Sequence, residues 1–309
     1  QNGGTVVFTQ PQPVQSIVLN PQNQNQSAID FLGTHFSLSG FNVHGPAQGS
    51  SCDVNGDGRN DIIVYEKTDL KTVVHVLLST GTGLTQTAAP DYLGAPGSKE
   101  CVYLIGDVNG DGKTDFIRVG QNKAVVFFTD PYAVGSNSRF NDGYQSTVGV
   151  PYAGQYYTDP QGYPQNNGNA QYQVGDVNGD GRSDLIAFYY AANQGGVFAA
   201  AFPSTAVGLG GSFTDTQNPN WVKVADQTGN INPNGDFAGQ VVFLDANGDS
   251  KTDIAALRSG KIKVSFYDEA QHKFVQSSDE TVLPGAPYGN RDRLIPADVN
   301  GDGNTDLLY

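Results

Sequence analysis

The chain has 309 residues, with 17 Lys and Arg against 31 Asp and Glu, giving a formal net charge of −14 at pH 7. This acidity argues against nucleic acids and anionic membrane surfaces as partners. Hydrophobic residues make up 38% of the chain, which is enough for a sizeable core, so the acidity is not that of a disordered tail. No apolar run approaches the roughly 18 to 20 residues of a membrane-spanning helix. The 39 glycines, 16 prolines, 16 Phe and 15 Tyr favour short strands joined by turns, and therefore an all-β protein.

One nine-residue pattern, with Asp at positions 1, 5 and 9 and Asn at position 3, occurs five times. The copies are loop 1 (53–61), loop 2 (107–115), loop 3 (176–184), loop 4 (245–253) and loop 5 (298–306). Their starts are 54, 69, 69 and 53 residues apart, a period typical of repeats that each form one small sheet. Continuing from the last start through both termini to the first gives 64 residues. This distance fits a closed ring of five units.

Short apolar runs flank the loops and predict three strands in each unit. We expect first strands over 102–105 and 241–244, second strands over 62–65, 116–119, 185–190 and 254–257, and third strands over 72–78, 123–129, 196–202 and 261–267. The fifth unit stops after its second strand. Residues 3–9 resemble the missing third strand, and residues 16–19 supply a fourth. Few helices are expected, because no window shows a capped 3.6-residue period.

These elements predict a single domain over 1–309, a five-bladed β-propeller of four-stranded sheets whose last blade combines both termini. Joining the ends removes exposed strand edges. The blades are expected over about 30–93, 94–150, 151–224, 225–283, and 284–309 with 1–29. The alternative is a slice of a longer propeller.

The loops present hard oxygen ligands in a compact turn, which favours Ca²⁺ over Mg²⁺ and, without His or Cys, over Zn²⁺. Position 7 contributes its backbone carbonyl, and glycine at position 6 permits a sharp turn. About five sites are expected, and five Ca²⁺ would bring the formal charge from −14 to about −4. The candidate ligands are Asp53, Asn55, Asp57, Arg59 and Asp61; Asp107, Asn109, Asp111, Lys113 and Asp115; Asp176, Asn178, Asp180, Arg182 and Asp184; Asp245, Asn247, Asp249, Lys251 and Asp253; and Asp298, Asn300, Asp302, Asn304 and Asp306. The alternative is a metal-free, Asp-rich turn.

Loop 4 carries Ser250 where the other loops have glycine at position 6. A residue with a Cβ is strained at positive φ, so loop 4 is expected to be the weakest site.

The loops and the Asp-Leu-Ile or Asp-Ile-Ile strands that follow them resemble the FG-GAP or VCBS repeats, the calcium-loop propeller blades of integrin α subunits and of many secreted bacterial and fungal proteins. The resemblance covers essentially the whole chain. It departs from the family because the Phe-Gly and Gly-Ala-Pro signatures are mostly missing and long Asn-, Gln- and Tyr-rich segments are inserted. The resemblance implies a propeller that serves in adhesion, as a lectin, in toxin assembly or beside a polysaccharide enzyme.

A second candidate site is the insertion 151–172, where aromatic faces stand among amide donors. Tyr152, Tyr156, Tyr157 and Tyr163 are its candidate ligand-binding residues, for stacking on a sugar or anchoring a protein. The alternative is that these tyrosines pack on their own blade. Trp221 is interpreted as a core residue, and Asn25 lies in the one N-glycosylation sequon.

No catalytic motif accompanies the four scattered histidines, so the chain is expected not to be an enzyme. Cys52 lies one residue before its loop and Cys101 six residues before its own, so on equivalent strands they are offset by five residues, or about 16 Å. This separation is too large for a disulfide bond and predicts two free thiols. Weak calcium sites of the extracellular kind place the protein outside the cell or on its surface. The predicted function is a calcium-stabilised, non-enzymatic binding or adhesion module with a protein or glycan partner. The alternatives are a carbohydrate-binding lectin, a part of a larger toxin, and a polysaccharide-active enzyme.

Overall fold

The fold was analysed in a computed structural model of the whole chain. The structure describes residues 30–32, 52–67, 72–86, 91–93, 102–120, 123–130, 140–141, 144–147, 157–158, 164–165, 171–191, 196–216, 219–226, 241–258, 261–282, 295–297, 299 and 305–308. Within these ranges all regular structure is β, and no helix long and apolar enough to cross a membrane was found among them.

The described strands form four antiparallel sheets in chain order, together with two isolated strand pairs. Sheet 1 contains β1 (Asp30–Leu32), β2 (Ile62–Lys67), β3 (Thr72–Ser79), β4 (Leu84–Gln86) and β5 (Asp91–Leu93), with β4 and β5 both paired to β3. Sheet 2 contains β6 (Val102–Gly106), β7 (Asp115–Gly120), β8 (Lys123–Phe127) and β9 (Tyr144–Thr147).

Sheets 3 and 4 have the same up-and-down order of four strands. Sheet 3 contains β12 (Gln171–Gly175), β13 (Asp184–Ala191), β14 (Gly196–Phe202) and β15 (Val222–Asp226). Sheet 4 contains β16 (Val241–Leu244), β17 (Asp253–Arg258), β18 (Lys261–Asp268) and β19 (Lys273–Val282). The two pairs are β10 (Tyr157–Thr158) with β11 (Pro164–Gln165), and β20 (Ile295–Ala297) with β21 (Asp306–Leu308).

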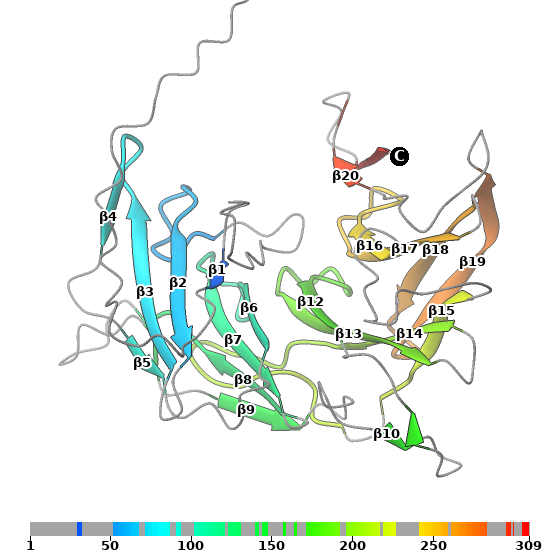
Figure 1. Cartoon of the computed structure of the whole chain (residues 1–309), viewed down its shortest axis with the longest axis horizontal. Helices are drawn as coiled ribbons and strands as arrows, with labels where there is room; N and C mark the ends of the chain where they lie inside the picture. Colours follow the sequence, from blue (N-terminus) through cyan, green and yellow to red (C-terminus); the bar gives the residue numbers. More distant parts are fainter. Residues whose placement is uncertain are drawn as a thin grey trace, which may run out of the picture.

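The sheets follow one another along an arc in chain order (Figure 1). Contacts join β6 to β12, β15 to β17, and β16 to β20, so each sheet from the second onward packs beside the next. This arrangement is that of propeller-like blades. The predicted strands of the first four units are confirmed, with ends that differ by one or two residues. The strands predicted over 3–9 and 16–19 lie outside the described residues.

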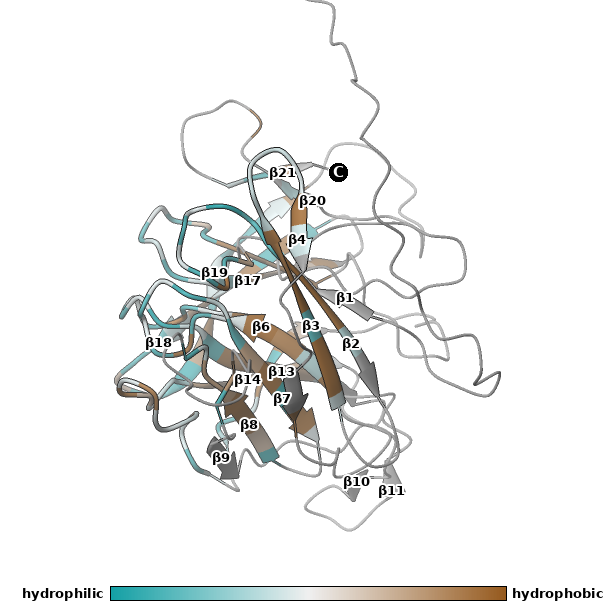
Figure 2. Cartoon of the chain, turned by 90° about the vertical axis from the view of Figure 1, so that its left-hand side faces the viewer, coloured by the Kyte–Doolittle hydropathy of each residue, from teal (hydrophilic) through white to brown (hydrophobic). Residues whose placement is uncertain are grey.

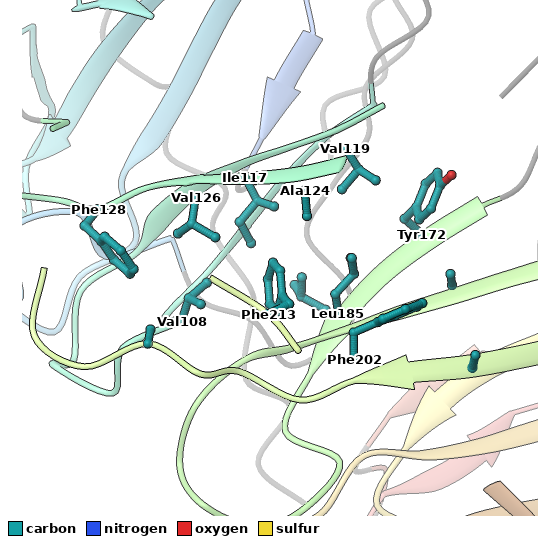
Figure 3. Packing of buried hydrophobic residues seen from close by; sticks show 14 of the residues in the cluster. Val108, Ile117, Val119, Ala124, Val126, Phe128, Tyr172, Leu185, Phe202 and Phe213 are labelled. Atoms are coloured by element: carbon teal, nitrogen blue, oxygen red, sulfur yellow. The ribbon is translucent and has the colours of Figure 1, made fainter. Parts of the chain in front are cut away.

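The three largest hydrophobic clusters each join two neighbouring sheets. Apolar residues concentrate on the strands and hydrophilic residues on the turns (Figure 2). Between sheets 2 and 3, buried side chains from both sheets interdigitate, among them Ile117, Phe128, Leu185 and Phe202 (Figure 3). Burial of such side chains stabilises each by roughly 1.5 to 3 kcal/mol relative to exposure. Each sheet therefore depends on its neighbour for stability.

Trp221 lies at the edge of this cluster, as expected for a core residue. It packs partly buried against the buried residues, and its ring contacts that of Tyr189 edge-on, with centroids 4.8 Å apart.

Candidate metal centre

Loops 1 to 4 occupy the same place in every sheet. Loops 2 to 4 each connect the first strand of their sheet to the second, as loop 2 connects β6 to β7, and loop 1 directly precedes β2. The Asp at position 9 begins the second strand or directly precedes it, and its side chain is buried: Asp61, Asp115 and Asp184 are 0% exposed and Asp253 is 2% exposed. The Asp residues at position 5 lie in the exposed part of each turn. Every loop therefore combines a deep carboxylate with shallower ones.

The buried carboxylate is held by backbone N–H groups. The N–H of position 2 donates to Oδ2 of position 9 in loops 1 to 4, at 2.9 to 3.0 Å. In loops 1 to 3 a second N–H, from the end of the third strand, donates to Oδ1: Ser79 to Asp61, Thr129 to Asp115, and Ser204 to Asp184, at 2.7 to 2.9 Å. The second bond ties the loop to the third strand of its own sheet.

The carboxylate at position 1 organises the turn. In loop 2, Asp107 accepts the N–H groups of Gly110 (2.7 Å), Asp111 (3.1 Å) and Gly112 (2.8 Å). Loops 1, 3 and 4 repeat these three bonds residue for residue. The amide oxygen at position 3 accepts the N–H of position 5 in all four. The backbone of each of these loops thus curls around the oxygen atoms that the sequence predicts as ligands.

Position 6 adopts the left-handed conformation, as the sequence predicted. Its φ is 79° at Gly58, 81° at Gly112, 82° at Gly181 and 65° at Ser250. Ser250 thus takes the turn in spite of its Cβ, and its N–H still donates to Asp245 Oδ2 at 2.7 Å. A non-glycine residue at such a φ is strained by roughly 1 to 2 kcal/mol.

The buried carboxyl groups at position 9 have raised pKa values. Burial, together with the neighbouring loop carboxylates, raises the pKa of Asp115 to about 8, although two backbone N–H groups oppose the shift. For the same reasons the pKa values of Asp184 and Asp253 rise to about 7, and that of Asp61 also rises. Three carboxylates around one turn therefore favour a bound cation.

The residues fit Ca²⁺ by the chemistry of their donors, since the side chains offer only carboxylate and amide oxygens. In loop 4, oxygens of Asp245, Asp249 and Asp253 all lie within 4.8 Å of one another, and this is the one such acidic group in the part of the chain that the structure describes. Loop 4 also differs from the others because no third-strand N–H among the described residues contacts Asp253.

The basic residue at position 7 touches two loops. In its own loop it pairs with the Asp at position 5: Arg59 with Asp57 at 2.5 Å, Lys113 with Asp111 at 3.6 Å, and Arg182 with Asp180 at 2.6 Å. Its stem lies against the preceding loop, where a Cβ built on Gly110 would be 3.2 Å from Arg182 Cγ. Exposed pairs of this kind contribute little, about 0 to 1 kcal/mol each. The pairs therefore offset only part of the loop charge.

The loops are also joined by backbone hydrogen bonds, which sequence reasoning missed. The N–H of position 8 donates to the position 1 carbonyl of the preceding loop: Thr114 to Asp53 (2.7 Å), Ser183 to Asp107 (2.6 Å) and Thr252 to Asp176 (2.6 Å). Ser or Thr at position 8 of loops 2 to 5 is a signal for this contact. Loops 1 to 4 thus form a continuous chain of contacts.

Several predicted site residues lie outside the described residues. These are Asp298, Asn300, Asp302 and Asn304 of loop 5, Tyr152, Tyr156 and Tyr163 of the insertion, Asn25, and Cys101. Of loop 5, the structure describes the N–H of Val299 donating to Asp306 Oδ2 at 3.1 Å, the same bond as in loops 1 to 4. Tyr157 lies in β10, which pairs with β11. The ligand-binding role of the four tyrosines therefore stays a prediction.

The repeat unit is that of a known family. A model of the FG-GAP-like repeat matches residues 53–130 and 245–309, which include loops 1, 2, 4 and 5. The chain carries FG-GAP-type repeats. Loop 3 lies between the matched stretches and has the same hydrogen bonds as loops 1, 2 and 4.

Among solved structures, a lectin from Agrocybe aegerita that recognises non-reducing terminal N-acetylglucosamine is similar, with 20% identity and a TM-score of 0.44. The match covers 75% of this chain and 50% of that chain. The Photorhabdus luminescens Tc holotoxin pore is similar with 18% identity and a TM-score of 0.45, over 84% of this chain and 10% of that chain. The chain thus spans about half the length of the lectin chain and a tenth of the toxin chain. Comparison with curated proteins gave no match.

Proposed function

We propose that the protein is a calcium-stabilised, non-enzymatic binding module of the extracellular space or cell surface, built as a five-bladed β-propeller. The observation that carries the proposal is the set of four equivalent loops, each with a buried Asp at position 9 surrounded by further carboxylates. The FG-GAP-like repeats support it as well. When bound, calcium would supply the positive charge that the three carboxylates lack.

The chain's own residues would hold the ion with side-chain oxygens of positions 1, 3, 5 and 9 and the carbonyl of position 7. The backbone bonds to Asp107 and Asp115 already hold loop 2 in a turn around these donors. Binding should therefore stabilise the folded chain over the unfolded chain, by about 2.7 kcal/mol per site when free Ca²⁺ is a hundred times Kd.

A five-bladed ring is the architecture that these repeats favour. Four sheets are described in order, and β20 of the pair β20–β21 packs beside β16. In the proposed ring this pair would begin the fifth blade. The apolar side chain of Leu307 lies against the cluster formed by Val242, Leu244, Ala255, Leu257 and Ile262 of sheet 4. The N-terminal residues would complete this fifth blade and close the ring.

The experiment is a calcium titration of the metal-free protein by calorimetry, combined with thermal unfolding in calcium and in EDTA. Calcium should raise the melting temperature, and Asp249→Asn should reduce the rise and remove one binding site. Asp279→Asn is the matched control, because it removes one exposed carboxylate on β19, outside the loops. A melting temperature that EDTA leaves unchanged, or equal effects of the two variants, would refute calcium stabilisation.

A further inference from the structure

A hairpin in sheet 3 extends from the end of β14 over two of the loops. It comprises residues 204–213, with bridges between Ser204 and Phe213 and between Val207 and Gly210. Its backbone bonds include Val207 N–H to Gly210 at 2.8 Å and Thr205 N–H to Ser212 at 2.9 Å. Its base is buried, since Ala206 and Phe213 are each 1% exposed. Figure 3 shows Phe213 beside Val108 of loop 2, within the cluster between sheets 2 and 3.

The hairpin contacts loop 2 through a candidate metal ligand. Asn109 at position 3 donates from Nδ2 to the carbonyl of Gly208 at 2.8 Å, while its Oδ1 accepts the N–H of Asp111. In loops 1, 3 and 4 the equivalent amide donates within its own loop to the Asp at position 5, as Asn55 and Asn178 do. Ser204 Oγ adds a bond to the carbonyl of Val108 at 2.6 Å. Loop 2 is thus distinguished from loops 1, 3 and 4 by this use of its amide.

The same hairpin contacts loop 3 through another residue of the ligand set. Arg182 at position 7 donates from Nη1 to the carbonyl of Ala206 at 3.3 Å and from Nη2 to Asp180 at 2.6 Å. The N–H of Ser204 also donates to Asp184 of loop 3, so the hairpin lies between two candidate calcium loops and bonds to two residues of each.

The tip of the hairpin is exposed, with Val207 at 79% and Leu209 at 37%. Packing holds the base of the hairpin. At the tip, the side-chain amide of Asn109 donates to the Gly208 carbonyl, and that of Asn141 donates to the Leu209 carbonyl at 3.2 Å. The order of the tip consequently depends on how firmly the Asn109 side chain is fixed.

From these contacts we propose that the hairpin 204–213 is a supporting shell for loops 2 and 3, and that a cation in these loops orders its tip. Groups that hydrogen-bond to metal ligands fix the orientation of those ligands. A cation on Asn109 Oδ1 would fix the amide plane and hence the donor that faces Gly208. Since energetic coupling is reciprocal, an ordered hairpin also strengthens cation binding in both loops. This proposal rests on the calcium role proposed above.

Amide hydrogen exchange of the full chain, with and without calcium, tests the proposal. The amides of Val207 and Gly210 should exchange about five-fold or more slowly in calcium, which is the lower end of ordinary coupling. Asn109→Asp keeps an oxygen ligand but replaces the donor with a carboxylate facing a carbonyl, so it should abolish this calcium-dependent slowing. Asn55→Asp makes the same change in loop 1, which the hairpin does not contact through its amide, and should leave the slowing intact.

Arg182→Lys is a second variant, since it keeps the positive charge but removes the fork that reaches both Ala206 and Asp180, and it should reduce the slowing in part. The calcium binding stoichiometry is measured in parallel. If calcium binds and the exchange of residues 205–210 does not change, or if Asn55→Asp acts like Asn109→Asp, the hairpin proposal is wrong while the calcium role stands. If no calcium binds, the calcium role itself fails.

Discussion

Gly175, the last residue of β12, lies directly against Thr252 of the next sheet. A Cβ built on Gly175 would be 2.5 Å from Thr252 Oγ1 and 2.8 Å from its Cγ2. The same contact recurs one sheet earlier, where a Cβ on Gly106 would lie 2.8 Å from Ser183 Oγ. Glycine directly before loops 2 and 3 thus permits the close approach that lets position 8 bond to the preceding loop.

Gly175→Ala should therefore destabilise the protein by about 1 to 3 kcal/mol through overpacking between sheets 3 and 4. Thr252→Gly in the same chain should recover part of this loss, because it removes the atoms that clash. Chemical denaturation of the two single variants and the double variant measures the coupling. Strictly additive effects would show that the two residues do not meet in the folded protein.

Ser250 changes the expectation for loop 4. Its φ of 65° lies in the left-handed region, where a residue with a Cβ is strained in the folded state. We expect the turn to keep this φ whether or not calcium is bound, so the strain should cancel from the binding free energy. Ser250→Gly should raise the free energy of unfolding by about 1 to 2 kcal/mol equally in calcium and in EDTA. The calcium affinity of loop 4 should stay within about two-fold.

Gly112→Ser is the converse variant, and a Cβ there would meet no atom within 4 Å, so strain alone should lower stability. Denaturation with and without calcium, together with calorimetric titration, separates the two quantities. A tenfold gain in calcium affinity on Ser250→Gly would instead return to the prediction from sequence that loop 4 is the weakest site.

The stability of the calcium-free protein should depend on pH through the buried carboxyl groups. Burial raises the pKa of Asp115 to about 8, whereas an unfolded Asp titrates near 3.9. Between these values the folded chain binds more protons than the unfolded chain, so the free energy of unfolding should fall as pH rises from about 4 to 8. Calcium should reverse the trend, because the ion requires the ionised carboxylate.

Asp115→Asn should flatten the pH dependence in calcium-free buffer, since it removes one such group. Urea denaturation at pH 5, 6, 7 and 8 gives the slope. A slope of the opposite sign in the calcium-free wild type would contradict the assignment.

Cys52 should be inert in the folded protein. Its thiol is free and 0% exposed, and burial together with Asp61 and Asp53 raises its pKa far above the ordinary range. Because the thiolate is the reactive form, iodoacetamide should not modify Cys52 until the chain unfolds. Peptide mapping after alkylation in native buffer and in guanidinium chloride measures this. Modification of Cys52 in native buffer would contradict this prediction and show that the segment before loop 1 opens readily.

The sequence by itself determined the repeat, the strands beside the loops and the candidate oxygen ligands, because these depend on local order. Alternating or continuous apolar runs define strands such as 196–202, which β14 matches. The glycine or serine at position 6 adopts a positive φ because the loop turns sharply there, and the nine-residue pattern alone predicts that turn. The spacing of Asp107, Asn109 and Asp111 likewise places their oxygens on one turn.

Only the tertiary structure decided which residues meet across sheets. The bond from Asn109 to Gly208 joins residues 99 positions apart, and nothing near Asn109 distinguishes it from Asn55 or Asn178. The contact of Gly175 with Thr252 depends equally on how closely two sheets pack. Burial of Asp115, which sets its pKa, also requires the neighbouring strands. Such relationships arise from packing between blades, and a pattern read along one strand carries no information about the blade beside it.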